Sequence, residues 1–260
     1  MPTSRKRQRT ARGRGQLRPR RLTYPRKSRP RRNASVAVPR GKLAFPQEMK
    51  TTLRYVESFD LEPTSATAAG ISLLANGLYD PEVSVGGHQP RGFDQYTELY
   101  HKFTVRSSKL SVTFSYEGYL GPAGTTATGQ PNQEVEDAGG DVPAVPGAIC
   151  LIHKAVAPNV TGTIENFQEK DKTKWTQIVP SSGPKTISTR MRASEFFGKD
   201  FLVGADGYTG DDSADPSNKL YYHIMAGLNS NEYPNQIKVR ANCVVEYDVV
   251  WTEPKQLAAS

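Results

Sequence analysis

Basic side chains crowd the first part of the chain, and their chemistry is that of phosphate binding. Residues 1–42 contain 13 Arg and 3 Lys but no Asp or Glu. Guanidinium and ammonium groups neutralise phosphates without reading base edges, so this density predicts sequence-independent binding to nucleic acid. The residues that we expect to contact phosphates are Arg5, Lys6, Arg7, Arg9, Arg12, Arg14, Arg18, Arg20, Arg21, Arg26, Lys27, Arg29, Arg31 and Arg32.

Two clusters within this segment are typical of nuclear import signals. One is Arg5-Lys6-Arg7-Gln8-Arg9, and the other is Arg26-Lys27-Ser28-Arg29-Pro30-Arg31-Arg32. A single cluster suffices for import, so import together with nucleic-acid binding accounts for both clusters better than import alone. We therefore expect nuclear import receptors among the partners of this protein.

The rest of the chain has the opposite charge balance. The chain holds 34 Lys and Arg and 26 Asp and Glu in all, so residues 43–260 carry 18 basic and 26 acidic side chains. A polycation with little apolar surface to bury cannot offset the roughly 1–2 kcal/mol per residue that backbone ordering costs. The sequence therefore predicts a disordered basic arm over residues 1–45 and one folded domain over residues 46–260.

Residues suited to catalysis are sparse. The four histidines, at positions 88, 101, 153 and 223, form no His-Glu-x-x-His pair, and the chain contains neither a Gly-x-Ser-x-Gly elbow nor a phosphate-binding Gly-Lys-Ser/Thr loop. Glu98 and His101 have the spacing of one half of a di-iron site, which requires two copies, so a solvated helix face explains them better. We expect no enzymatic activity and no cofactor.

A cluster of acids at Asp206, Asp211 and Asp212 lies on a Gly-rich stretch that could wrap a hard cation. The spacing does not match an EF-hand loop, and a solvated surface loop is the favoured interpretation over an intersubunit cation site. A hydrolase that used Asp211 or Asp212 would also need a paired nucleophile and base, and the sequence offers none.

The cysteines and the distribution of apolar residues indicate in which cellular environment the protein folds. Cys150 and Cys243 each lie in an apolar run without metal-ligand spacing, which indicates small buried side chains in a reduced environment. The sequence alone also permits a disulfide between them. No run of 18 apolar residues occurs, so we expect no membrane insertion.

The pattern after the arm is that of β-strands. Alternating apolar and polar residues, or runs of β-branched and aromatic residues, predict strands at 51–59, 103–105, 109–116, 219–225 and 237–251, with weaker candidates at 148–154, 175–179 and 185–191. In the first of these, Leu53, Tyr55 and Phe59 share one face. Residues 237–251 are long enough for a strand near the centre of a sheet.

Helices are few and two loops are long. The sequence predicts a helix over residues 94–101 with Asp94 as its N-cap, and a single turn over residues 193–197. The stretches 118–147 and 204–218 are rich in Gly, Pro and acids and are candidates for the exterior. Long strands joined by elaborate loops indicate an all-β sandwich such as a jelly roll.

Three turn-rich or aromatic motifs follow one another in the first half of the domain. They are Asn76-Gly77-Leu78-Tyr79-Asp80-Pro81, then Gly87-His88-Gln89-Pro90-Arg91-Gly92-Phe93-Asp94-Gln95, then Tyr100-His101-Lys102-Phe103-Thr104-Val105. In this order and behind an Arg-rich N-terminus, the chain resembles capsid proteins of circular, Rep-encoding single-stranded DNA viruses, relatives of the circoviruses. The resemblance covers the arm and residues 70–116, and we expect His88 to be a hydrogen-bonded structural residue.

The resemblance implies an eight-stranded viral jelly roll of two four-stranded sheets that self-assembles into a small icosahedral shell with the arm inside. The cargo would be circular single-stranded DNA, or host RNA in expressed particles, and the protein would be found in the virion and, during assembly, in the host nucleus. About 60 subunits with 16 arm charges each would balance on the order of a thousand phosphates. The host-cell receptor stays unidentified.

From the residues alone, the alternative is a cellular nucleic-acid-binding β-sandwich with an Arg-rich tail. Such a chromatin or ribonucleoprotein factor would stay monomeric or dimeric at high concentration.

Overall fold

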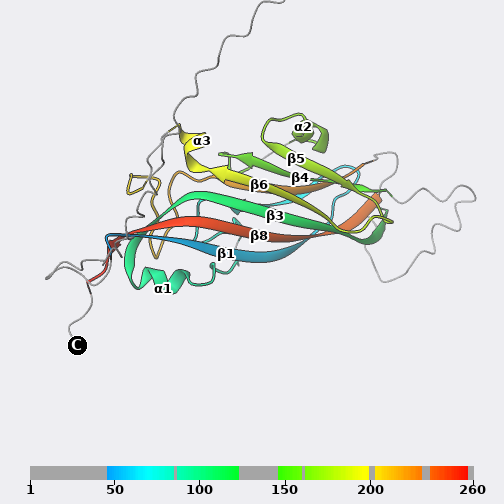
Figure 1. The fold of residues 1–260 in the computed structure, drawn as a ribbon. Helices are drawn as coiled ribbons and strands as arrows, with labels where there is room; N and C mark the ends of the chain where they lie inside the picture. The colour runs from blue at the N-terminus through cyan, green and yellow to red at the C-terminus, as the bar shows by residue number, and fades with distance from the viewer. Residues whose placement is uncertain are drawn as a thin grey trace, which may run out of the picture. The chain divides into compact units, whose positions relative to one another are not determined.

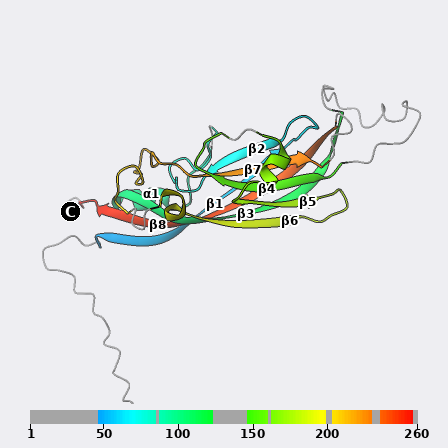
Figure 2. The ribbon, with the colours of Figure 1, turned by 90° about the horizontal axis from the view of Figure 1, so that it is seen from above.

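Two antiparallel sheets of four strands each form the folded part of the chain (Figures 1 and 2). The computed structural model describes residues 46–84, 87–122, 146–159, 162–198, 203–229 and 235–256. The first sheet has the strand order β1 (Glu48–Leu61), β8 (Asn235–Pro254), β3 (Tyr100–Pro122) and β6 (Lys185–Arg192). The second has the order β2 (Ala69–Leu74), β7 (Tyr221–Leu228), β4 (Ala148–Ala155) and β5 (Thr173–Ile178).

The order of the strands is that of a jelly roll. β1 pairs with β8, β2 with β7, β3 with β6 and β4 with β5, so four antiparallel pairs are nested one inside the next. The nested ribbon folds over into two facing sheets, which is the double-sheet jelly-roll arrangement. The predicted all-β jelly-roll fold is therefore confirmed.

The core lies between the two sheets and is built by alternation along each strand. Leu53 and Tyr55 of β1 and Tyr247 of β8 point inward and are buried, whereas Arg54 between the first two is exposed. The largest buried side chain, Trp251, lies near Phe103 and donates a hydrogen bond from Nε1 to the Thr51 hydroxyl at 2.8 Å. The period-two pattern in the sequence thus decides which face of each strand is buried.

The predicted strands are present, and most extend beyond their predicted ends. The segments 103–105 and 109–116 belong to one strand, β3, which continues through an irregularity between Val105 and Ser107. β3 also includes residues 118–122, so that part of the predicted loop 118–147 is strand, and residues 123–145 lie outside the described residues. β2 has no counterpart among the predicted strands, because it begins with Ala69 and Gly70, which have low β propensity, and is held by pairing with β7.

The predicted helix over residues 94–101 is wrong in its start and its length. α1 spans Phe93–Thr97 and its N-cap is Gly92, at a φ of 95° that favours glycine. From Tyr100 onward the chain pairs with β8, and this sheet pairing ends the helix. Asp94 is therefore in the first turn, and Tyr96 lies in α1 whereas Tyr100 lies in β3.

The other two helices each consist of five residues. α3 (Ala193–Phe197) matches the predicted single turn and ends at Gly198, which has a φ of 63°. α2 (Ile164–Gln168) is not predicted by the sequence pattern. Its Ile164 and Phe167 pack on the outer side of the second sheet against Leu151 and Met225 in a small separate cluster.

Candidate nucleic-acid interface

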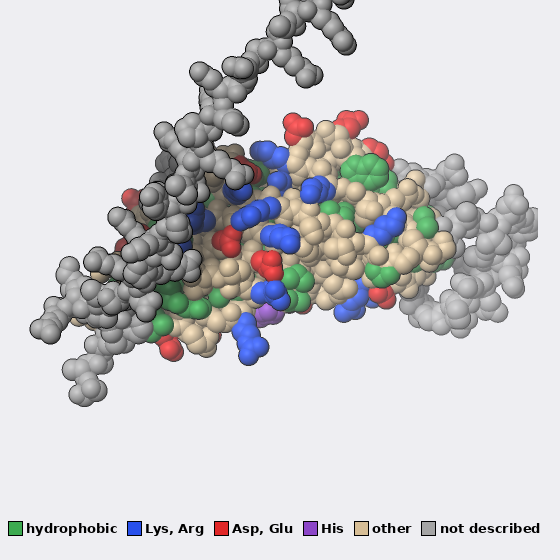
Figure 3. All heavy atoms as spheres, viewed as in Figure 1, with side chains coloured by type: hydrophobic (Ala, Val, Ile, Leu, Met, Phe, Trp, Pro, Cys, Tyr) green, Lys and Arg blue, Asp and Glu red, His purple; other side chains and the backbone are tan. Residues whose placement is uncertain are grey.

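The outer face of the β1-β8-β3-β6 sheet gathers cations from three of its strands. Two cross-strand rows lie side by side, namely Arg54, Glu246, Lys109 and Arg190, followed by Thr52, Asp248, Ser107 and Arg192. Together they contain four cations and two carboxylates. Figure 3 looks onto this face and shows Lys and Arg side chains gathered over β3 and β6. This half of the sheet is therefore suited to an anionic polymer.

The next two cross-strand rows on the same face are neutral and rich in hydroxyl groups. The Ser111 and Ser188 hydroxyls lie 2.8 Å apart, and so do those of Thr113 and Thr186. These cross-strand pairs tie β3 to β6 and leave small polar side chains on the surface. Hydroxyls of this kind serve as hydrogen-bond partners for phosphate and sugar oxygens.

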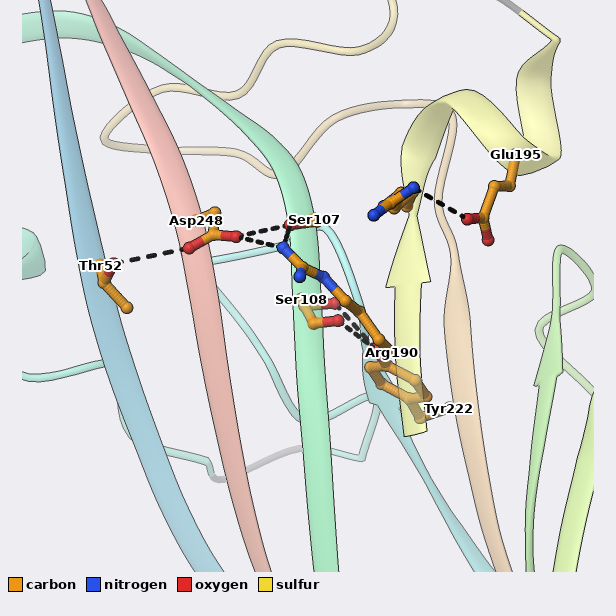
Figure 4. Close-up of polar contacts among 8 residues, drawn as sticks. Thr52, Ser107, Ser108, Arg190, Glu195, Tyr222 and Asp248 are labelled. Atoms are coloured by element: carbon orange, nitrogen blue, oxygen red, sulfur yellow. Dashed lines mark hydrogen bonds and ion pairs between the residues drawn. The ribbon is translucent and has the colours of Figure 1, made fainter. Parts of the chain in front are cut away.

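A hydrogen-bonded network crosses the charged rows (Figure 4). The Asp248 carboxylate on β8 accepts hydrogen bonds from the Ser107 hydroxyl at 2.6 Å and from Arg190 Nη2 at 2.9 Å. Arg190 Nη2 also lies 2.9 Å from the Ser107 hydroxyl, and the Thr52 hydroxyl lies 3.5 Å from Asp248. One carboxylate thus fixes side chains from all the other strands of the sheet.

The network forms part of the wall of a groove of about 750 Å³. Its basic lining residues are Lys50, Arg106, Arg190 and Arg192, its acids are Glu48 and Asp248, and its hydroxyl-bearing residues are Thr51, Thr52, Ser107 and Ser194. Excess positive charge together with hydroxyl donors is the composition expected of a phosphate-binding surface.

Most cations of this face remain accessible to a ligand. Arg190 and Arg192 pair with Asp248 and Glu195, but their side chains are still 55% and 58% exposed. Exposed ion pairs of this kind contribute little to stability, so a phosphate can compete for the guanidinium groups. Among the described residues, no carboxylate lies within ion-pair distance of Lys50, Arg106 or Lys109.

The chain enters the folded domain beside this groove. The first described residue, Pro46, accepts a hydrogen bond from the Tyr100 hydroxyl at 3.1 Å, and Glu48 opens β1 and lines the groove. All arm residues named above for phosphate contact and nuclear import, from Arg5 to Arg32, lie outside the described residues. The described part of the domain therefore begins beside the groove, at residue 46.

Sequence reasoning placed the interface on the arm and missed the cations of the sheet. Arg54, Lys109 and Arg190 all occupy outward positions in alternating strands, and this signal was visible in the sequence. The information that their strands are neighbours comes only from the topology, because residues 54 and 190 are far apart in the chain.

The motif at residues 76–81 forms a loop that is held by one carboxylate. Asp215 accepts backbone N–H hydrogen bonds from Leu78, Tyr79 and Asp80 at 2.8, 2.9 and 3.1 Å. Asn76 adds a hydrogen bond from its side-chain amide to the Asn218 carbonyl at 2.8 Å. The motif therefore has a structural role, which is to dock this loop onto residues 204–218.

His88, in the second motif, is a hydrogen-bonded structural residue as predicted. Its Nδ1 lies 2.9 Å from the Gln89 carbonyl oxygen, and its Nε2 lies 3.0 Å from that of Val56 on the edge strand β1. Carbonyls accept only, so the doubly protonated ring satisfies both contacts. The Gln89 carbonyl, with lesser contributions from the Val56 carbonyl and Glu57, raises the pKa of His88 above its usual value.

The acidic stretch at residues 206–212 makes its contacts within the protein. Asp211 Oδ1 accepts hydrogen bonds from the Ser213 backbone and hydroxyl and from the Ala214 backbone, at 2.8–2.9 Å. These bonds lower the pKa of Asp211. Asp212 pairs with Lys255 at 3.2 Å. Asp211 and Asp212 are therefore engaged by groups of the same chain, and Asp206 is exposed.

Metal-ligating side chains do not cluster in the described part of the chain. There, no three His, Cys, Asp or Glu side chains are placed to hold a metal ion. Glu98 caps the end of α1 and His101 lies on β3, so the two do not share a helix face. Cys150 and Cys243 are free and buried in opposite sheets, and burial raises the pKa of each thiol to about 12.

Among the residues that the structure describes, no helix has the length and apolar character needed to cross a bilayer.

Comparison with known proteins gives only distant structural likenesses. No family model and no curated protein matches the chain. The solved structure of turnip yellow mosaic virus at 100 K shares 9% identity, with a TM-score of 0.38, over 82% of this chain and 99% of its own. The decameric BFDV capsid protein shares 10% identity, with a TM-score of 0.38, over 78% of this chain and 99% of its own. The EDTA-treated capsid of Penaeus monodon metallodensovirus shares 11% identity, with a TM-score of 0.38, over 81% of this chain and 76% of its own. These neighbours are structures of viruses and viral capsid proteins.

Proposed function

We propose that this protein is the subunit of a viral capsid, a structural and non-enzymatic role. It self-assembles into a small closed icosahedral shell and packages circular single-stranded DNA through its Arg-rich arm. The jelly-roll order of the strands supports this role, because double-sheet jelly rolls are a recurrent architecture of capsid proteins. The motifs shared with capsid proteins of circular single-stranded DNA viruses support the same role independently.

One observation carries the proposal furthest, namely that the described domain begins beside its basic groove. Residue 46 leads directly into β1, whose first residue lines the groove between Lys50, Arg190 and Arg192. In the proposed shell this face points inward, so that arm and sheet meet the same cargo. The more acidic remainder of the domain supplies contacts between subunits and the exterior.

The chemistry proposed for packaging is phosphate neutralisation. The arm residues from Arg5 to Arg32 supply most of the positive charge, and the groove cations extend it onto the folded surface. Such contacts carry no base readout, so host RNA would fill particles that are expressed without the genome. Binding would weaken steeply as salt concentration rises.

The proposal includes nuclear entry through the two arm clusters. Replacing the basic residues of 5–9 and 26–32 by Ala, separately and together, tests it by fluorescence microscopy of the full chain in cells. Loss of nuclear signal only in the double replacement supports two redundant signals. Nuclear accumulation of the double replacement would contradict the role of these residues in import.

The decisive experiment compares the full chain with a chain that lacks residues 1–42. Electron microscopy of purified protein should show regular spherical particles for both chains, and the ratio of absorbance at 260 and 280 nm should show nucleic acid only with the full chain. Truncated particles that hold as much nucleic acid as the full chain would contradict the role of the arm. Light scattering of the full chain at high concentration measures its oligomeric state. Monomers or dimers would favour the alternative of a cellular nucleic-acid-binding protein.

A further inference from the structure

Two buried histidines face each other on the outer side of the second sheet, away from the basic groove. His153 of β4 and His223 of β7 are direct cross-strand partners, and they are 9% and 1% exposed. Their rings are nearly parallel, at 19°, with centroids 6.3 Å apart. Tyr221 stacks on His223 at 5.8 Å, and the Phe167 ring of α2 meets His153 edge-on at 5.4 Å. Two imidazoles thus share a small covered space.

His223 ties a loop to the sheet in its neutral form. Its Nε2 lies 2.9 Å from the Ala157 carbonyl oxygen, to which it can only donate, and its Nδ1 lies 2.7 Å from the Ser72 hydroxyl. With the proton on Nε2, Nδ1 accepts from Ser72 and both contacts are satisfied without a net charge. The ring therefore holds residues 155–159 against β7.

His153 lies under α2, which is a weakly attached cover. The His153 Nδ1 is 2.8 Å from the Thr173 hydroxyl on β5. α2 has only five residues and contacts the sheet through Ile164 and Phe167. Because few apolar contacts hold this cover, its local opening costs much less free energy than unfolding of the whole domain.

The surroundings of the pair oppose positive charge. The groups that face it are Ser72 of β2, Thr173 of β5, Tyr221 of β7, Phe167 of α2, the Ala157 carbonyl, and the ammonium groups of Lys170 and Lys172. None of these is a carboxylate, and Lys170 Nζ lies 3.9 Å from the centre of the Phe167 ring that covers His153. Burial, with His223, Lys170 and Lys172 as further causes, lowers the pKa of His153 to about 4. Burial also lowers the pKa of His223.

We propose that His153 and His223 form an acid-operated latch that releases α2 and residues 155–159 from the outer face of the second sheet when the pair takes up protons. A proton on either ring creates a buried cation beside the other ring, and a cation at His153 is also repelled by Lys170 and Lys172. Opening the cover brings water to the rings and separates the charges. Because the closed state holds both rings neutral and the open state lets them titrate near their usual value of about 6.5, closure weakens as the pH falls below about 6.5.

Hydrogen exchange of the full chain, followed by mass spectrometry at pH 7.5 and pH 5.0 and corrected for the intrinsic exchange rate, tests the latch. From the pKa of His153 alone, the open fraction at pH 5.0 should rise about 30-fold. Amides of residues 155–159 and 162–172 should therefore exchange about 30-fold faster, whereas those of β8 should not change. Equal corrected rates at the two pH values would overturn the proposal.

Two variants test whether the acid response comes from His153 and His223 or from other groups that titrate in the same range. The double replacement H153Q/H223Q removes both titrating groups, and Gln at position 223 can still donate to the Ala157 carbonyl, so the acid response should be lost. H101Q is the matched control, since His101 is an exposed histidine on β3. A response that persists in H153Q/H223Q, or that is lost in H101Q, would contradict the latch.

One measurement needs no variant and covers the case in which H153Q/H223Q fails to fold. Slow exchange of the imidazole C2 hydrogens in the unmodified protein reports the titration of each histidine. Midpoints below the usual value of about 6.5 for both His153 and His223 support the latch. A midpoint at or above 6.5 for either one would overturn it, because that ring would then be accommodated as a cation in the closed state.

Discussion

Arg190 and Asp248 form an ion pair across an intervening strand. Arg190 lies on β6 and Asp248 on β8, and β3 runs between them, yet Arg190 Nη2 reaches Asp248 Oδ2 at 2.9 Å. The guanidinium group therefore reaches over β3, where it also donates a hydrogen bond to the Ser107 hydroxyl. Arg190 and Asp248 both line the groove, so the carboxylate partly neutralises the cation there.

The Arg190–Asp248 ion pair predicts that two substitutions have opposite effects on nucleic-acid binding. R190A should weaken binding of a single-stranded oligonucleotide by the full chain about four-fold at 150 mM salt, because one phosphate contact is lost, and should reduce the slope of log affinity against log salt by about 0.7. D248N should strengthen binding, since Arg190 is then free for phosphate. Fluorescence anisotropy over a range of salt concentrations measures both effects.

The matched control for this prediction is R240A. Arg240 lies on β8, on the same outer face of the sheet as Arg190, but it is outside the groove and lies 3.6 Å from Asp60. R240A should change the affinity less than R190A does. Equal losses would mean that general charge, and not the groove, governs the contribution of the domain.

Removal of the carboxylate that holds the loop at residues 76–81 should destabilise the domain. D215A leaves three backbone N–H groups without their acceptor, at a cost of about 2–3 kcal/mol if water does not replace it. Urea unfolding monitored by tryptophan fluorescence measures this loss. D206N, in the same loop region but on an exposed side chain, should change stability by less than about 0.5 kcal/mol, and similar losses in the two variants would refute this role of Asp215.

His88 should make a pH-dependent contribution to stability of opposite sign to that of the buried pair. Its pKa is raised in the folded state, so its contribution is fully present below the unfolded pKa of about 6.5 and is lost as the pH rises through the folded pKa. The melting temperature of H88Q should therefore fall below that of the unmodified protein at pH 6 and approach it at pH 8.5. A difference that does not vary with pH would show that His88 acts through packing on Tyr55 alone.

Both thiols should be unreactive in the folded protein. Cys150 and Cys243 are fully buried, and burial raises their pKa values to about 12, so almost no thiolate is present near pH 8. A thiol reagent such as Ellman's reagent should label neither residue until denaturant is added, and should then label both. Rapid labelling of the native chain would show that the sheets open readily around these residues.

The sequence predicted those parts of the fold in which a local pattern decides the outcome. The alternation of Leu53, Arg54 and Tyr55 is sufficient to assign a strand and its buried face, and the αL position of Gly198 marks the end of α3. The pattern failed at Tyr100, whose spacing from Tyr96 suits a helix while pairing with β8 places it in a strand.

The candidate site was predictable only in its charge. The acid-free arm is visible as composition, whereas the groove depends on Lys50, Arg106 and Arg190 arriving from three strands that are distant in the chain. The buried histidine pair has the same origin, because residues 153 and 223 become neighbours only through the pairing of β4 with β7. Long-range register is not encoded in any short window of residues.

The pairing of β1 with β8 has a consequence for synthesis on the ribosome. Thr52 meets Asp248 across 196 residues, and β8 is the strand that both β1 and β3 require as a partner. Until the last strand has left the exit tunnel, these two earlier strands have unsatisfied backbone edges and an unshielded apolar face. Contacts of such long sequence separation form slowly, so the nascent chain passes through an aggregation-prone interval that helper proteins of the cell would have to cover.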